Sequence, residues 1–181
     1  MSTHAGFLRG INLGPRRRVG GADLRSAFEG MGFGNVATFR ASGNVAFAAG
    51  EEGAAGLEGR IERGLAESLG FEVAVFVRTG AEVRAIAAHH PFDPADVEAS
   101  RGKLQVALLR DRPAAAARKE VLALASDEDR LAFGERELYW LPSGGIRDSA
   151  LNFKAIEQRV GATTMRTKGT VEELARKWFG T

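Results

Sequence analysis

The chain has 181 residues, a length that fits one domain or two small subdomains that share a core. Its 25 lysines and arginines nearly balance its 23 aspartates and glutamates, so the net charge of +2 does not demand a nucleic-acid partner. The absence of cysteine excludes disulfides, thiolate metal ligands and cysteine nucleophiles. No apolar run is long enough for a signal peptide or a membrane span, so we expect no membrane association and a cytoplasmic location.

Strand and helix patterns alternate along the first half of the chain. Leu24, Ala27 and Phe28 fall on one face of a helix, and the turn "SGN" at 42–44 separates two short strands. The predicted elements are a strand at 5–9, a helix from about 22 to 31, strands at 36–39 and 45–47, a helix at 57–69 and a strand at 71–78. This β-α-β-β-α-β order is typical of the ferredoxin-like fold.

The second half repeats the same order of elements. The predicted elements are a strand at 103–110, a helix at 112–125, a hairpin at 129–142 that turns at 134–136, a helix with its apolar face at 153, 156 and 160, and a strand at 163–167. Tyr139 and Trp140 point to opposite faces of their strand, so we expect at most one of them in the core.

Each half ends in one more helix, and the residues there echo each other. "RTGAEVRAIAA" from Arg78 aligns with "RTKGTVEELAR" from Arg166, 88 residues later. This favours an internal duplication. We therefore predict an α+β fold of two tandem ferredoxin-like (β-α-β-β-α-β) halves, each followed by an extra helix. The predicted organisation is a first half with its trailing helix at 1–90, a polar connecting loop at 91–101 and a second half with its trailing helix at 102–181.

Four segments carry a resemblance to a known family: "FLRGINLG", "LRSAFEGMGFGNVATFRASGNVAF", "VFVRTGAEVRAIAAHHPF" and "TTMRTKGTVEELARKW". In these segments and in their order the chain resembles DUF1697, a family of bacterial proteins of uncharacterised function. The resemblance extends over essentially the whole chain. It implies two ferredoxin-like α/β halves, and it implies no reaction.

The loop after the first strand is rich in glycine and arginine. Gly10 and Gly14, followed by a helix N-terminus, can expose backbone N–H groups around an anion, and the nearby arginines add charge and bidentate donors. The spacing matches neither the phosphate-binding P-loop motif nor the dinucleotide motif G-x-G-x-x-G. A solvated surface loop is the alternative.

The first and third strands of a ferredoxin-like sheet are antiparallel neighbours. The end of the first strand, at Arg9 to Asn12, is therefore expected opposite the start of the third, at Ser42 to Asn44. Hairpin geometry alone can also explain the polar residues of that turn. We predict a ligand site in which the two segments converge, formed by Arg9, Asn12, Arg16, Arg17, Arg18, Ser42 and Asn44.

The helix-free face of the first sheet offers a second hypothesis. Phe7 and Arg9 share one face of their strand, as do Phe76 and Arg78, and rings beside guanidinium groups can bind a single nucleic-acid strand. The aromatic RNA-binding motif of such sheets is absent. We favour the alternative that the other half of the duplication or a second subunit covers this face.

Residues for acid–base or metal chemistry are few. His89 and His90 precede Pro91 in a loop, where Asp93 and Asp96 could pair with them. We favour a surface loop there, and we predict no metal and no cofactor. Ser149 and Lys154 could form a second anion pocket, although helix capping also explains Ser149.

No general base lies beside the first loop. We therefore favour a module that binds an anionic or phosphorylated ligand, either a small metabolite or, less favoured, nucleic acid. The alternatives are an enzyme that acts on a small phosphorylated substrate and a protein-interaction module without a ligand.

Overall fold

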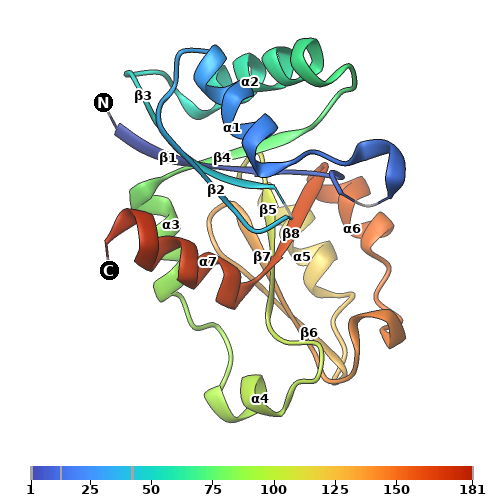
Figure 1. Cartoon of the computed structure of the whole chain (residues 1–181). Helices are drawn as coiled ribbons and strands as arrows, with labels where there is room; N and C mark the ends of the chain where they lie inside the picture. Colours follow the sequence, from blue (N-terminus) through green and yellow to red (C-terminus); the bar gives the residue numbers. More distant parts are fainter. Residues whose placement is uncertain (1, 13, 42, 181) are drawn as a thin grey trace. The chain divides into compact units, whose positions relative to one another are not determined.

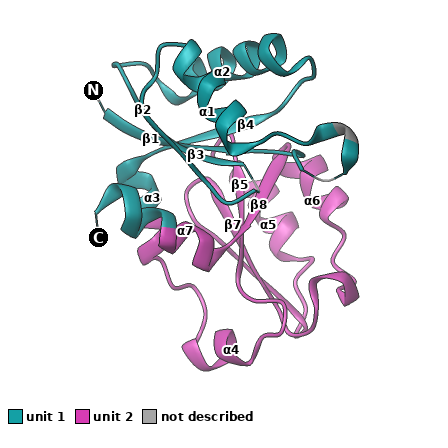
Figure 2. Cartoon of the chain, in the orientation of Figure 1, with its two compact units in different colours: residues 1–84, 174–181 teal, residues 85–173 magenta. Residues whose placement is uncertain are grey.

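The computed structural model describes residues 2–12, 14–41 and 43–180, except for the side chain of Arg16. The chain forms two compact units (Figure 2). Unit 1 comprises residues 1–84 and 174–181, and unit 2 comprises residues 85–173. The chain therefore enters unit 2 within one helix and returns to unit 1 at the end of another.

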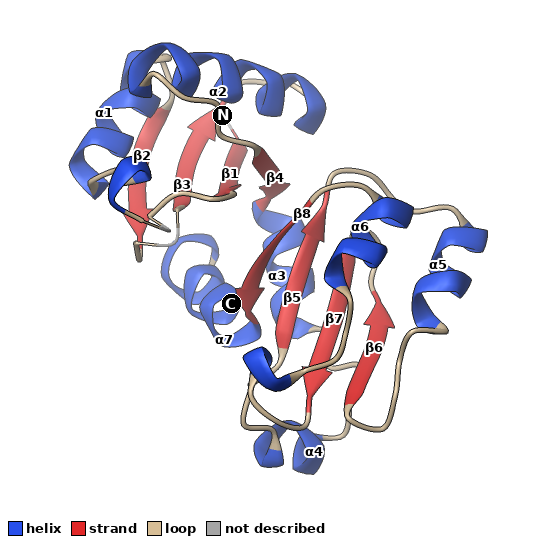
Figure 3. Cartoon of the chain, turned by 90° about the vertical axis from the view of Figure 1, so that its right-hand side faces the viewer, coloured by secondary structure: helices blue, strands red, loops and turns tan. Residues whose placement is uncertain are grey.

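Unit 1 is a four-stranded antiparallel sheet in the order β2-β3-β1-β4, with two helices on one face (Figures 1 and 3). Its elements are β1 (Ser2–Leu8), the 3₁₀ helix η1 (Pro15–Arg17), α1 (Gly21–Gly30), β2 (Gly34–Phe39), β3 (Asn44–Ala49), α2 (Ala54–Leu69) and β4 (Val75–Thr79). The helix α3 (Gly80–Ala88) follows β4. This is the predicted ferredoxin-like order, which is confirmed.

The core of unit 1 forms where the helices meet the sheet. α1 buries Leu24 and Phe28, and α2 buries Leu57, Ile61 and Leu65, at the helical spacing that the sequence shows. These side chains pack in one cluster with residues of the strands. α2 ends where Gly70 adopts φ 75°, a left-handed conformation that glycine takes without steric cost.

Unit 2 repeats the arrangement with the strand order β6-β7-β5-β8, and α5 and α6 lie on one face of its sheet (Figure 3). Its elements are α4 (Pro94–Ala99), β5 (Gln105–Leu109), α5 (Ala115–Leu122), β6 (Asp129–Phe133), β7 (Glu137–Pro142), the 3₁₀ helix η2 (Ile146–Asp148), α6 (Phe153–Val160), β8 (Thr163–Thr167) and α7 (Lys168–Leu174). The short helix α4, for which Asp93 accepts a hydrogen bond from the N–H of Ala95, stands where the sequence predicts a loop.

Tyr139 and Trp140 differ from the expectation, because both side chains are buried. Trp140 enters the core beneath α6, where its ring lies 5.4 Å from that of Phe153. Tyr139 points to the other face, where the ring of His89 lies 4.9 Å away. Alternation along a strand leaves one residue exposed only if one face of the sheet meets solvent, and β7 is covered on both faces at this point.

The duplication extends to the roles of equivalent residues. Thr79 caps α3, with its hydroxyl accepting from the N–H of Glu82 at 3.2 Å. Thr167 caps α7 in the same way, accepting from the N–H of Thr170 at 3.2 Å. The preceding arginines, Arg78 and Arg166, are both buried, and each donates to the carbonyl of the residue before it. Burial lowers the pKa of Arg166 to about 10, so its guanidinium stays protonated at neutral pH.

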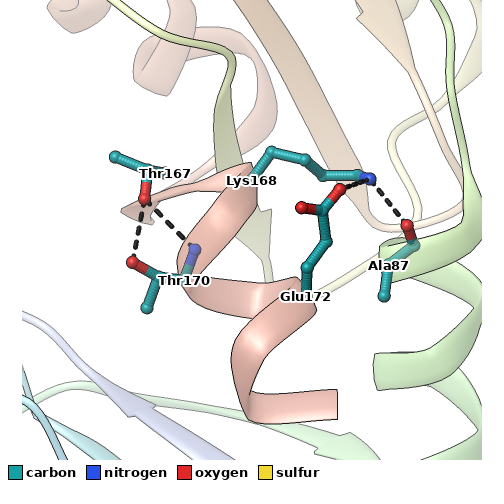
Figure 4. Close-up of polar contacts among 5 residues, drawn as sticks. All are labelled: Ala87, Thr167, Lys168, Thr170 and Glu172. Carbon is teal, nitrogen blue, oxygen red and sulfur yellow. Dashed lines mark hydrogen bonds and ion pairs between the residues drawn. The ribbon is translucent and has the colours of Figure 1, made fainter. Parts of the chain in front are cut away.

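The start of α7 also holds a buried lysine (Figure 4). The Lys168 side chain is 5% exposed, and its ammonium donates to the carbonyl oxygen of Ala87 and to Oε1 of Glu172, each at 2.7 Å. Both contacts lie within unit 2. They give a buried charge the partners that burial requires.

Candidate functional site

The ends of β1 and β3 meet as the topology predicts. Phe7 pairs with Asn44, and the N–H of Leu8 donates to the carbonyl oxygen of Gly43 at 2.8 Å. The loop after β1 and the turn between β2 and β3 therefore lie at the same end of the sheet of unit 1. Gly43 has φ 77°, and a Cβ there would come within 2.6 Å of Ile11 Cδ1, so the close approach of the two segments needs glycine.

Asn12 joins these two segments. Its Nδ2 donates to the carbonyl oxygen of Ala41 at 2.6 Å and to that of Val19 at 3.3 Å, while its Oδ1 accepts from the N–H of Val19 at 2.8 Å. Its φ of 56° is a conformation that asparagine adopts more readily than most residues. The side chain thus holds the loop in place and uses its polar atoms within the protein.

Asn44 and Arg17 are also engaged by the main chain. Asn44 is fully buried, and its Nδ2 donates to the carbonyl oxygen of Phe39 at 2.8 Å, inside the β2–β3 turn. The guanidinium of Arg17 donates to the carbonyl oxygen of Glu72 at 2.8 Å and lies 5.1 Å from the ring of Phe71. The contacts of Arg17 tie the arginine-rich loop to the segment before β4.

The remaining predicted residues have different places. Arg9 is half-buried, directly follows β1 and does not line the cleft described below. Arg18 is exposed, directly after η1 and before α1. Ser42 and the side chain of Arg16 lie outside the described residues.

A cleft of about 660 Å³ opens between the two converging segments. Arg18 and Arg40, both exposed, line it together with Thr38 of β2. Gly20 and Gly21, at the start of α1, also line the cleft. Since the N-cap Gly20 has no side chain to accept from the first N–H groups of the helix, those groups can donate to a ligand. The residues lining the cleft are Ile11, Asn12, Arg18, Val19, Gly20, Gly21, Leu24, Thr38, Arg40, Ala41 and Gly43.

This lining is suited to an anion. Two guanidinium groups, a threonine hydroxyl and a helix N-terminus are all donors, and the helix dipole adds positive potential that the carboxylate of Asp23, in the first turn of α1, offsets in part. Arg40 and Thr38 were not predicted from the sequence. The sequence did show that Arg40 immediately precedes the turn that was expected opposite the end of β1, and this could have added it to the site. In the structure its φ is 58°.

Three of the residues that the nucleic-acid hypothesis places on the helix-free face are buried. Phe7, Phe76 and Arg78 are each 0% exposed. A base cannot stack on a ring that solvent does not reach. The expectation that this face is covered holds for these three side chains.

Ser149, one of the two residues considered for a second pocket, makes contacts within the protein. The hydroxyl of Ser149 donates to Oδ1 of Asp129 at 2.7 Å and accepts from the N–H of Leu151. Oδ1 of Asp129 also accepts from the indole N–H of Trp140 at 2.7 Å, which fixes the loop before α6. Within the described ranges, no group of three or more histidine or acidic side chains is placed to hold a metal ion.

The fold and the cleft together define an α+β protein of two ferredoxin-like units with a candidate anion site in the first. The chain belongs to DUF1697, a family of proteins of unknown function, whose model matches residues 1–139. It is similar to the solved structure of the conserved bacterial protein SP0830 from Streptococcus pneumoniae, with a TM-score of 0.72 and 18% identity over 97% of each chain. That similarity shows the fold. No curated protein matches the chain.

Among the helices of the described part of the chain, none combines the length and apolar character needed to cross a bilayer.

Proposed function

We propose that this protein is a binding module for a small anionic ligand, with a phosphorylated metabolite as the preferred class, and that the ligand binds in the cleft of unit 1. The observation that carries the proposal is the exposed guanidinium of Arg18 in that cleft. Within the described part of the chain it forms no hydrogen bond or ion pair. A cation held at a helix N-terminus without a protein partner favours a ligand of opposite charge.

The residues divide into two roles in this proposal. Arg18 and Arg40 contact the anion, and the hydroxyl of Thr38 and the first N–H groups of α1 complete the set of donors. Asn12, Asn44 and Arg17 position the loops through their bonds to the main chain. Arg9 makes no direct contact with the ligand.

The size of the cleft favours a metabolite over a simple ion. A volume of about 660 Å³ lies in the range of sites that hold organic ligands, which is roughly 300–1,000 Å³. Ile11, Val19 and Leu24 supply apolar surface beside the cations. A ligand that combines a phosphate with an organic part matches both features.

The lining also favours binding over catalysis. The cleft residues include no histidine, carboxylate, lysine or tyrosine among those that the structure describes. Proton transfer in an enzyme site needs such a group within hydrogen-bonding reach. The arrangement therefore supports a binding module more than an enzyme.

The test is calorimetric titration of the full chain with pyrophosphate. We expect binding that weakens roughly tenfold in Arg18→Gln and in Arg40→Gln, since each loses a charge-assisted hydrogen bond. Arg147→Gln is the matched control, because Arg147 is an exposed arginine of η2 and does not line the cleft. Absence of binding, or the same affinity in all three variants, would reject the proposal.

A further inference from the structure

The last turns of unit 1 place a tryptophan and two cations near the β2–β3 turn. Residues Ala175–Phe179 form a π-helix (η3), in which Phe179 is buried, Trp178 is half-buried, and Arg176 and Lys177 are exposed. The ring of Trp178 lies 5.2 Å from that of Phe39, at an angle of 66°. Phe39 is the last residue of β2 and directly precedes Arg40 of the cleft.

Cations and rings alternate from Lys177 to Arg40, with the half-buried ring of Trp178 open to solvent and the ring of Phe39 buried beside it. The Lys177 ammonium lies 4.6 Å from the ring centroid of Trp178 and 5.7 Å from that of Phe39. The guanidinium carbon of Arg40 lies 5.2 Å from the ring centroid of Phe39. The Phe39 ring thus connects an arginine of the cleft with the indole of Trp178. All four residues belong to unit 1.

This surface has the two features that recognise a nucleotide. Aromatic rings stack on bases of any sequence, and neighbouring cations bind phosphate. Arg176 and Lys177 form no ion pair with any residue that the structure describes. The contact between exposed Lys177 and Trp178 is weak, so a base can replace the ammonium on the ring while the ammonium turns to the phosphate.

We infer that the ligand of the cleft is a nucleotide, whose phosphate groups bind at Arg18 and Arg40 and whose base packs on Trp178. The phosphate half of this inference rests on the proposed function, and the base half rests on the separate contacts of η3. The nucleotide is either a free metabolite or one unit of a single strand, because both present a phosphate and a base.

The test compares pyrophosphate, a nucleoside diphosphate and a short single-stranded oligonucleotide on the full chain. We expect the nucleoside diphosphate to bind on the order of tenfold tighter than pyrophosphate, which is the gain from stacking one base. Trp178→Leu should remove that gain and leave the affinity for pyrophosphate unchanged. Trp178→Phe, which keeps a ring, should retain part of it.

Tryptophan fluorescence gives a second readout. The chain has two tryptophans, so Trp140→Phe leaves Trp178 as the sole reporter. Nucleotide should quench its emission and pyrophosphate should not. A thermal unfolding curve confirms that each variant is folded.

The outcomes separate the two claims. Equal affinities for pyrophosphate and the nucleoside diphosphate, with no quenching, would overturn the nucleotide inference and leave the anion site standing. Failure of pyrophosphate to bind would overturn the proposed function. A preference for the oligonucleotide, with log K falling roughly 0.7 per phosphate contacted as log salt rises, identifies nucleic acid as the source. A preference for the free nucleotide identifies a metabolite.

Discussion

Asn12 donates a 2.6 Å hydrogen bond to the carbonyl oxygen of Ala41, and this bond joins the loop after β1 to the turn between β2 and β3. The two residues are 29 positions apart in the sequence. The same side chain bonds both main-chain groups of Val19, just before α1. One amide therefore holds together the two segments that line the cleft.

Replacing Asn12 with alanine should lower the free energy of unfolding by about 2–3 kcal/mol more than replacing Asn35 with alanine. Asn35 is the matched control, because it is exposed, has φ 49° and bonds through its side chain to no residue in the described ranges. Both variants carry the same cost of alanine at positive φ, so the difference reports the hydrogen bonds of Asn12. Urea denaturation measures it. Equal losses in the two variants would contradict the positioning role of Asn12.

The contact of the two segments at Gly43 gives a second prediction. Gly43→Ala should destabilise the protein by about 3 kcal/mol, because a Cβ at positive φ would meet Ile11 Cδ1 at 2.6 Å and Leu8 Cβ at 2.9 Å. Gly59→Ala should instead stabilise it by about 0.5–1 kcal/mol, since Gly59 lies within α2 and a Cβ there meets nothing within 4 Å. Thermal unfolding compares them. A neutral Gly43→Ala would show that the close approach is not required.

The equivalent helix caps of the two units should respond alike to substitution. Thr79→Ala and Thr167→Ala should each lower stability by about 1 kcal/mol, because each removes the acceptor for an N–H in the first turn of a helix. Thr79→Ser and Thr167→Ser keep the hydroxyl and should recover most of the loss. The measurement is the midpoint of chemical denaturation. Recovery at one position and not at the other would argue against equivalent roles.

The two partners of Lys168 should differ in importance. Lys168→Met should lower the free energy of unfolding by about 1–3 kcal/mol, because it leaves the carbonyl oxygen of Ala87 without its donor in a buried place (Figure 4). Glu172→Gln should cost less than about 1 kcal/mol, since the glutamate side chain is 46% exposed and its ion pair is screened by water. Denaturation curves of both variants test this. A larger loss of stability in Glu172→Gln than in Lys168→Met would show that the ion pair matters more than the bond to Ala87.

Much of the fold follows from the sequence because its signals are local. Leu57, Ile61 and Leu65 recur at a helical period and are buried in α2, and the turn at Gly43 and Asn44 joins two paired strands. From the order of elements, the antiparallel pairing of β1 with β3 could also be deduced, and with it the meeting of their ends. The burial of both Tyr139 and Trp140 could not be deduced from the sequence, since it depends on what covers each face of β7.

The meeting of the two loop segments could be predicted from the sequence, whereas the directions of their side chains could not. Arg17 and Arg18 are indistinguishable as letters, yet the turn of η1 directs Arg17 to the carbonyl oxygen of Glu72, whereas Arg18 stays exposed in the cleft. Arg40 follows directly after β2 and has a positive φ of 58°, a conformation that its sequence position does not reveal. Side-chain direction in loops is decided by such backbone details, which no sequence period encodes.

The most direct test of the anion site is the change in backbone amide NMR signals when pyrophosphate is added to the full chain. The account predicts that the largest shifts fall in two stretches, Gly20 to Asp23 at the start of α1 and Thr38 to Ala41 at the end of β2, because both line or adjoin the cleft. These shifts should vanish in the double variant Arg18→Gln/Arg40→Gln. Shifts centred on unit 2, or no shifts at saturating pyrophosphate, would contradict the account.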